Sequence, residues 1–130
     1  MLAKKKNIII LVVSLAILGA IIATICVFLL KTQPAEIDPR SFEEIFWDSE
    51  TSEEAIETFQ KKIDATPDPI EKADLYNERS NYLFLNATDE THKDQIIYDA
   101  EESNKLNPTY DSEMYLEIIY GNYNIKKAAE

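Results

Sequence analysis

The sequence predicts an all-α protein, with one transmembrane helix followed by a small domain of antiparallel helical hairpins. Three observations predict this fold class. An uncharged apolar stretch runs from Ile8 to Leu30, helix start signals recur after it, and no later segment shows the alternation of a β-strand. The only glycines are Gly19 and Gly121, so the glycine-containing turns that connect β-strands are missing.

The apolar segment, residues 8–30, is long enough to cross a bilayer. At about 1.5 Å per residue its helix is about 34 Å long, against a hydrocarbon core of about 30 Å. A cleavable signal peptide is the alternative, because Lys4–Lys6 form a basic leader. The apolar run is longer than an ordinary signal sequence, and no small-residue cleavage site precedes Lys31, so an uncleaved anchor is expected.

The distribution of basic residues predicts the orientation of this anchor. Lys4–Lys6 precede the span, whereas residues 31–40 after it carry balanced charge. The positive-inside rule therefore predicts residues 1–7 in the cytoplasm and the C-terminal domain on the extracytoplasmic face of the membrane. Residues 31–40 contain two prolines and no apolar periodicity, which is typical of a linker, and residues 41–130 form the domain.

The domain is strongly acidic. All 24 acidic residues but only 10 of the 13 basic residues follow Leu30, so this part carries a net charge of −14. Such a charge repels nucleic acid and anionic lipid headgroups, so we expect no nucleic-acid ligand. It favours a protein or peptide partner of basic character. The single cysteine, Cys26, lies in the apolar segment, so the domain folds without a disulfide.

Five helices are expected in the domain, and three have clear start signals. Ser41 and Glu44 form a capping box, and Thr51 with Glu54 forms a second. Asp68 can cap the third helix, because a proline follows it at the first helical position. The expected helices cover residues 41–47, 51–66, 69–85, 88–106 and 111–128.

Apolar and small residues at helical spacing predict the buried faces of the four longer helices. These faces consist of Ala55, Ile56, Phe59 and Ile63; Ile70, Ala73, Tyr76, Ser80, Leu83 and Phe84; Ile96, Ile97, Ala100 and Ser103; and Met114, Tyr115, Ile118 and Ile119. For the first helix, Phe42, Phe46 and Trp47 have two equal alternatives. They lie either at the membrane interface, where tryptophan is favoured, or inside the first hairpin.

Two segments resemble tetratricopeptide repeats. Ala55, Phe59 and Pro67 match the second-helix pattern Ala-x3-Phe-x2-Ala-x4-Pro, although Lys62 stands at the second alanine. Pro108 closes a similar segment 41 positions later, a longer period than the usual ~34 residues. The resemblance implies two hairpins and a closing helix, the smallest stack of this kind, and an unrelated small helical bundle is the alternative.

The resemblance also implies where a partner would bind. In tetratricopeptide-like stacks the first helix of each hairpin lines a concave face, which here would present Tyr76, Asn77, Arg79 and Tyr115. A second kind of contact is expected in the span. Its small residues, Ala16, Gly19, Ala20 and Ala23, have the small-xxx-small spacing that lets membrane helices approach closely.

No catalytic, cofactor or metal-binding pattern is found. One histidine and one cysteine are too few for a tetrahedral zinc site, and the two glycines form no phosphate-binding loop. His92 lies in a polar run and is expected at the surface. We therefore expect no enzymatic activity, no cofactor and no bound metal.

A non-enzymatic scaffold or adaptor is the function that remains. The anchor would hold an interaction module on the extracytoplasmic face and raise the local concentration of its partner. The alternative is an accessory single-span subunit of a membrane complex, in which the transmembrane helix carries recognition.

Overall fold

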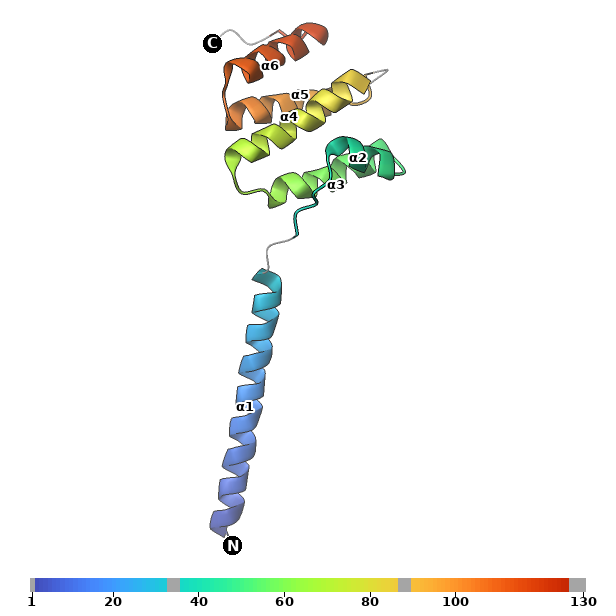
Figure 1. The fold of residues 1–130 in the computed structure, drawn as a ribbon. Coiled ribbons are helices and arrows are strands. Elements are labelled where there is room, and N and C mark those ends of the chain that lie inside the picture. Colours follow the sequence, from blue (N-terminus) through green and yellow to red (C-terminus); the bar gives the residue numbers. More distant parts are fainter. Residues whose placement is uncertain (1, 33–35, 87–89, 127–130) are drawn as a thin grey trace. The chain divides into compact units, whose positions relative to one another are not determined.

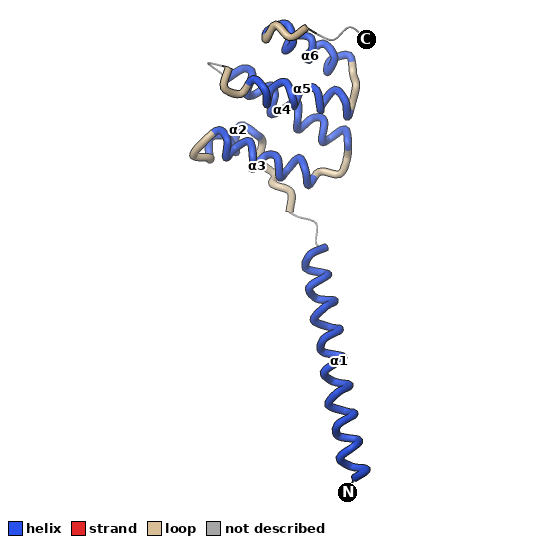
Figure 2. The backbone as a smooth tube through the Cα atoms, turned by 180° about the vertical axis from the view of Figure 1, so that it is seen from behind, coloured by secondary structure: helices blue, strands red, loops and turns tan. Residues whose placement is uncertain are grey.

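The computed structural model describes residues 2–32, 36–86 and 90–126, and it confirms the predicted fold class. Every regular element in the described residues is an α-helix (Figures 1 and 2). The chain forms two compact units, residues 1–35 and residues 36–130. Within the described ranges, the first contains one long helix, and the second contains five shorter ones that pack as hairpins.

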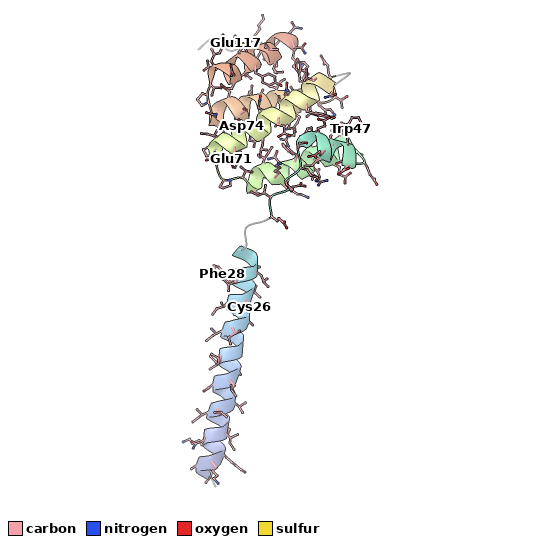
Figure 3. All side chains as sticks on the ribbon, in the orientation of Figure 1. Cys26, Phe28, Trp47, Glu71, Asp74 and Glu117 are labelled. Atoms are coloured by element: carbon pink, nitrogen blue, oxygen red, sulfur yellow. The ribbon has the colours of Figure 1, made fainter. Side chains whose placement is uncertain are left out.

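The first unit is α1 (Leu2–Thr32), which is long and apolar enough to cross a membrane. Its apolar side chains point outward on all sides, as Cys26 and Phe28 show in Figure 3, a pattern typical of a helix in lipid. The hydroxyls of Ser14 and Thr24 donate hydrogen bonds of 2.8 Å to the carbonyls four residues earlier. These two polar side chains are thus satisfied within the helix.

The second unit stacks its helices in chain order. It contains α2 (Phe42–Asp48), α3 (Ser52–Ala65), α4 (Pro69–Asn86), α5 (Lys93–Leu106) and α6 (Tyr110–Asn122). The helices α2 and α3 form one hairpin, α4 and α5 form the next, and α6 packs on α5 at the end of the stack (Figures 1 and 2).

The predicted caps of α2 and α4 are present. Ser41 and Glu44 form the reciprocal capping box of α2. At α4, Asp68 Oδ1 accepts the backbone N–H groups of Ile70 and Glu71, both at 2.9 Å. These contacts satisfy N–H groups that the helix itself leaves without a partner.

The cap of α3 differs from the prediction in one respect. The Thr51 hydroxyl accepts the Glu54 N–H at 3.1 Å, as expected. The Glu54 carboxylate, however, accepts the N–H of Glu50 at 2.9 Å rather than that of Thr51. The two bonds therefore do not form a reciprocal capping box, because the carboxylate bonds one residue earlier than the N-cap. Both bonds still stabilise the start of α3.

The start of α5 was predicted too early. The helix begins at Lys93, after a turn at residues 90–92, and not at Thr88, which lies outside the described residues. His92 occupies the N-cap position and is partly exposed, but its side chain makes no capping hydrogen bond.

Both ends of α6 also differ from the prediction. Thr109 caps the helix, in a box with Ser112, so α6 begins at Tyr110 and not at Asp111. It ends at Asn122, because Asn124 adopts a left-handed conformation with φ 53°. The expected end at Ala128 lies outside the described residues.

The end of α6 has the hydrogen bonds of a Schellman motif. The N–H of Asn124 bonds the carbonyl of Gly121 at 3.3 Å, and the N–H of Ile125 bonds that of Tyr120 at 2.9 Å. This pattern closes a helix with a left-handed residue, a position that asparagine tolerates better than most residues.

Aromatic packing at α2 decides between the two alternatives for Phe42 and Phe46. Phe42 is fully buried, and its ring lies 5.1 Å from Phe59 and 5.5 Å from Tyr82. Phe46 packs against the same cluster, whereas Trp47 remains 74% exposed. Phe42 and Phe46 therefore belong to the domain core.

The buried faces of α4 and α6 were predicted only in part. Ile70, Met114 and Ile118 were expected in the core but are about half exposed, at 55%, 45% and 51%. Leu116 is buried in α6, and Arg79 is fully buried in α4. The buried face of α6, which contains Leu116 and Ile119, is therefore rotated about the helix axis by part of a turn from the predicted face.

Arg79 joins three helices through a buried ion pair. Its guanidinium forms two hydrogen bonds of 2.8 Å to the carboxylate of Asp99 on α5. It also donates to the carbonyl of Ile56 at 3.0 Å and to the amide oxygen of Gln60 at 2.8 Å, both on α3. Gln95 donates to Asp99 at 2.9 Å, so the carboxylate has a further partner.

Candidate binding cleft

An open cleft of about 410 Å³ lies between α4, the end of α5 and the start of α6. Its size is within the range of ~300–1,000 Å³ that ligand-binding clefts occupy. It is lined by Ala73, Asp74, Asn77, Asn81, Ser103, Asn107, Thr109, Asp111, Ser112 and Tyr115. Figure 3 shows Asp74 on α4.

Helical spacing explains how α4 contributes its wall. Asp74, Asn77 and Asn81 are separated by three and four residues and therefore lie on one face. All three are exposed, whereas Ala73 beside them is buried. Ala73 and the buried Ser103 on α5 are small, and this leaves room for the floor of the cleft.

Tyr115 forms a fixed wall on the α6 side. Its hydroxyl lies 3.0 Å from Ser80 Oγ, and the Ser80 hydroxyl donates to the carbonyl of Ile96 at 2.8 Å. Since that serine hydrogen is used, the tyrosine is the donor in the first bond. Burial raises the pKa of Tyr115 to about 12, so the side chain is neutral at physiological pH.

The start of α6 is held in place beside the cleft. Ser112 Oγ lies 2.8 Å from the side-chain oxygen of Asn104 on α5. The same hydroxyl accepts the Thr109 N–H at 2.9 Å in the capping box. The wall formed by Ser112 and Tyr115 is therefore anchored by hydrogen bonds to both α4 and α5.

The rim of the cleft offers polar groups that are not used within the fold. Among the described residues, the side chains of Asp74, Asn77, Asn81 and Asp111 have no hydrogen-bond or ion-pair partner. The lining residues include two carboxylates and no lysine, arginine or histidine. The carboxylates of the cleft can therefore accept hydrogen bonds from a cationic group. Its asparagine amides can both donate to and accept from a peptide group.

The structure separates the four residues that were expected to contact a partner. Asn77 and Tyr115 line the cleft together. Tyr76 is only 6% exposed and packs its ring 6.1 Å from that of Tyr98. Arg79 is 0% exposed and bonded within the core, so its guanidinium does not face a partner.

Eight of the ten lining residues were not predicted as site residues, and three of them, Asp74, Asn81 and Asp111, belong to the polar rim. Asp74 and Asn81 lie one turn before and one turn after Asn77, so helical spacing alone could have found them. Asp111 was assigned to the start of the last helix, and its place beside α4 depends on how α6 packs. No local signal in the sequence carries that information.

The small residues of α1 lie on an exposed surface. Ala16, Gly19, Ala20 and Ala23 are all exposed, and a side chain added at Gly19 would meet no atom within 4 Å. A shallow apolar depression of about 350 Å³ includes Ala20. It is otherwise lined by Ile17, Ile21, Thr24 and Ile25.

The described residues contain no group of three or more potential metal ligands. No protein-family model matches the chain, and neither a curated protein nor a solved structure matches it.

Proposed function

We propose that this protein is a membrane-anchored interaction module, with α1 as the anchor and the cleft as the site that binds a segment of a partner protein. The proposal includes the tetratricopeptide-like arrangement, in which α4 and α6 are first helices that face a common concave side. In this proposal the protein is a non-enzymatic scaffold or adaptor on the extracytoplasmic face of the membrane.

The main observation in support is the set of unused polar groups along the cleft. An extended peptide presents N–H and C=O groups in alternation, and the amides of Asn77 and Asn81 can bond to both. The carboxylates of Asp74 and Asp111 would attract a basic side chain of the same peptide. The anchor would keep a weakly bound partner near the membrane by raising its effective concentration.

A second candidate function is favoured by the surface of α1. The apolar depression at Ala20 and Thr24 would let another membrane helix approach closely. In that case the protein is an accessory subunit of a membrane complex, and the span carries recognition.

Purification of the tagged full chain from its native membrane in mild detergent tests the two candidates. Proteins that co-purify are quantified for the wild type, for the cleft variant Asn77→Ala/Asn81→Ala and for the span variant Ala16→Leu/Ala20→Leu. We expect the cleft variant to lose at least tenfold of the specific partner and the span variant to retain it.

The matched control is Glu57→Ala/Lys61→Ala, a pair of exposed polar residues on α3, away from the cleft. It removes two polar side chains and leaves the net charge unchanged. Loss of the partner from the span variant alone would favour the second candidate. Equal recovery with all variants would contradict both sites.

A further inference from the structure

The side of α6 that faces away from the core is apolar. Tyr110, Met114 and Ile118 are spaced by four residues and therefore form one stripe along the helix. They are 79%, 45% and 51% exposed. Leu116 and Ile119 are buried on the opposite side. α6 is thus apolar on two faces, which is typical of a helix with neighbours on both sides.

This stripe lies on the last helix of the described residues. In the first two hairpins a first helix, α2 or α4, packs against the helix that follows it. Among the described helices, α6 packs along α5 and bonds to α4 through the Tyr115 hydroxyl, and none follows it (Figures 1 and 2). Among the described residues, no helix covers the exposed stripe.

The charges around the stripe restrict what that helix can be. Acidic Asp111, Glu113 and Glu117 flank the stripe, and α6 contains no basic residue. Glu117 projects from the helix in Figure 3. A second copy of this domain, with a net charge of −14, would bring carboxylates against carboxylates. An anionic membrane surface would be repelled in the same way.

We propose that the outer stripe, Tyr110, Met114 and Ile118, binds an amphipathic helix of a partner protein whose apolar face is flanked by lysine or arginine. The partner helix packs on the stripe as the second helix of a third hairpin. Its basic flanks pair with Asp111, Glu113 and Glu117. This surface lies on the outer side of α6 and shares only Asp111 with the rim of the cleft.

The experiment uses the full chain in nanodiscs of zwitterionic lipid and a fluorescent 18-residue helical peptide. The peptide has leucines on one face and lysines on both flanks, and fluorescence anisotropy measures its affinity. We expect Met114→Ser/Ile118→Ser to weaken binding at least tenfold. Leu85→Ser, which removes an apolar side chain that is 71% exposed on α4, should change it less than twofold.

Three controls make the result specific. Empty nanodiscs measure binding to lipid, a scrambled peptide of the same charge measures general attraction to the acidic domain, and Asn77→Ala/Asn81→Ala tests the cleft. The proposal requires weak binding of the scrambled peptide and unchanged binding to the cleft variant. If either requirement fails, only the proposal for the stripe is overturned. The function of the cleft is tested separately, by co-purification of the native partner.

Other outcomes would also overturn it. Equal binding of both peptides would mean that bulk charge, rather than the stripe, attracts them. No binding of the helical peptide to the wild type would show that the stripe accepts no basic helix. Sedimentation of the wild type as a dimer that the stripe variant abolishes would assign the surface to a second copy of the chain.

Discussion

Arg79 is the residue on which the arrangement of three helices depends. Removing a guanidinium and a carboxylate from water costs several kcal/mol per ion, and the hydrogen bonds described above offset that cost. No buried side-chain nitrogen or oxygen of the described residues lacks a hydrogen-bond partner. The pair therefore selects one register between α3, α4 and α5, because a shift of any helix would leave a buried charge unpaired.

Substitution of one partner of this pair should strongly destabilise the domain. We expect Arg79→Met to lower the free energy of unfolding by about 3–5 kcal/mol, because Asp99 becomes an unpaired buried charge. The double variant Arg79→Met/Asp99→Leu should recover most of this loss. Urea unfolding of the full chain in detergent, followed by circular dichroism, measures both.

Arg40 provides the matched control for that prediction. Its ion pairs to Asp38 and Asp48 are 2.6 and 3.0 Å long but partly exposed. Arg40→Met should therefore destabilise the domain far less than Arg79→Met. A double variant no more stable than Arg79→Met would show that shape, and not charge pairing, determines the role of Arg79.

The burial of Arg79 could not be read from residue type, because an arginine in an acidic helical domain is normally exposed. Its spacing was informative, however. Arg79 lies three residues after Tyr76 and four before Leu83, two residues of the predicted stripe that are buried. The missing information was its partner, since Asp99 is 20 residues away and is brought near only by the hairpin.

At the scale of the elements, the sequence predicts helices well where a cap is local. Ser41 and Asp68 act on residues within one turn, so both starts were predicted correctly. The end of α6 was missed because Asn124, rather than a glycine, takes the left-handed conformation. Asparagine is common in many other contexts and is therefore a weaker signal than glycine.

Substitutions at Asn124 should show that this residue ends α6. Asn124→Ala should lower the free energy of unfolding by about 1 kcal/mol. Alanine has a Cβ atom, which disfavours positive φ, and it lacks the polar group that lets asparagine adopt this conformation. Asn124→Gly should be neutral or slightly stabilising. Urea unfolding with circular dichroism compares the two, and equal stabilities would contradict the role of backbone conformation here. Asn122→Ala, at the last residue of the helix, is the control.

At the scale of the whole molecule, the asymmetry of charge determines the expected orientation in the membrane. Three lysines precede the apolar part of α1, whereas residues 31–40 after it carry balanced charge. The positive-inside rule retains the basic end in the cytoplasm, and this orientation stays a prediction.

Labelling with a membrane-impermeant maleimide in intact cells tests the orientation. In a Cys26→Ser background, Glu117→Cys should be labelled without lysis, whereas Lys5→Cys should be labelled only after lysis. The reverse pattern would place the domain in the cytoplasm. The parent Cys26→Ser chain, without a thiol, provides the background signal.

The contacts of α6 also bear on the order in which the domain opens. Arg79 couples α3, α4 and α5, so these helices should unfold as one cooperative unit. α6 is joined to them by its packing on α5, by Tyr115 and by a 2.6 Å hydrogen bond from Tyr120 to Glu101. Native-state fluctuations should therefore release α6 first. A ligand that bridges α4 and α6 would slow this release, so occupancy and local rigidity would rise together.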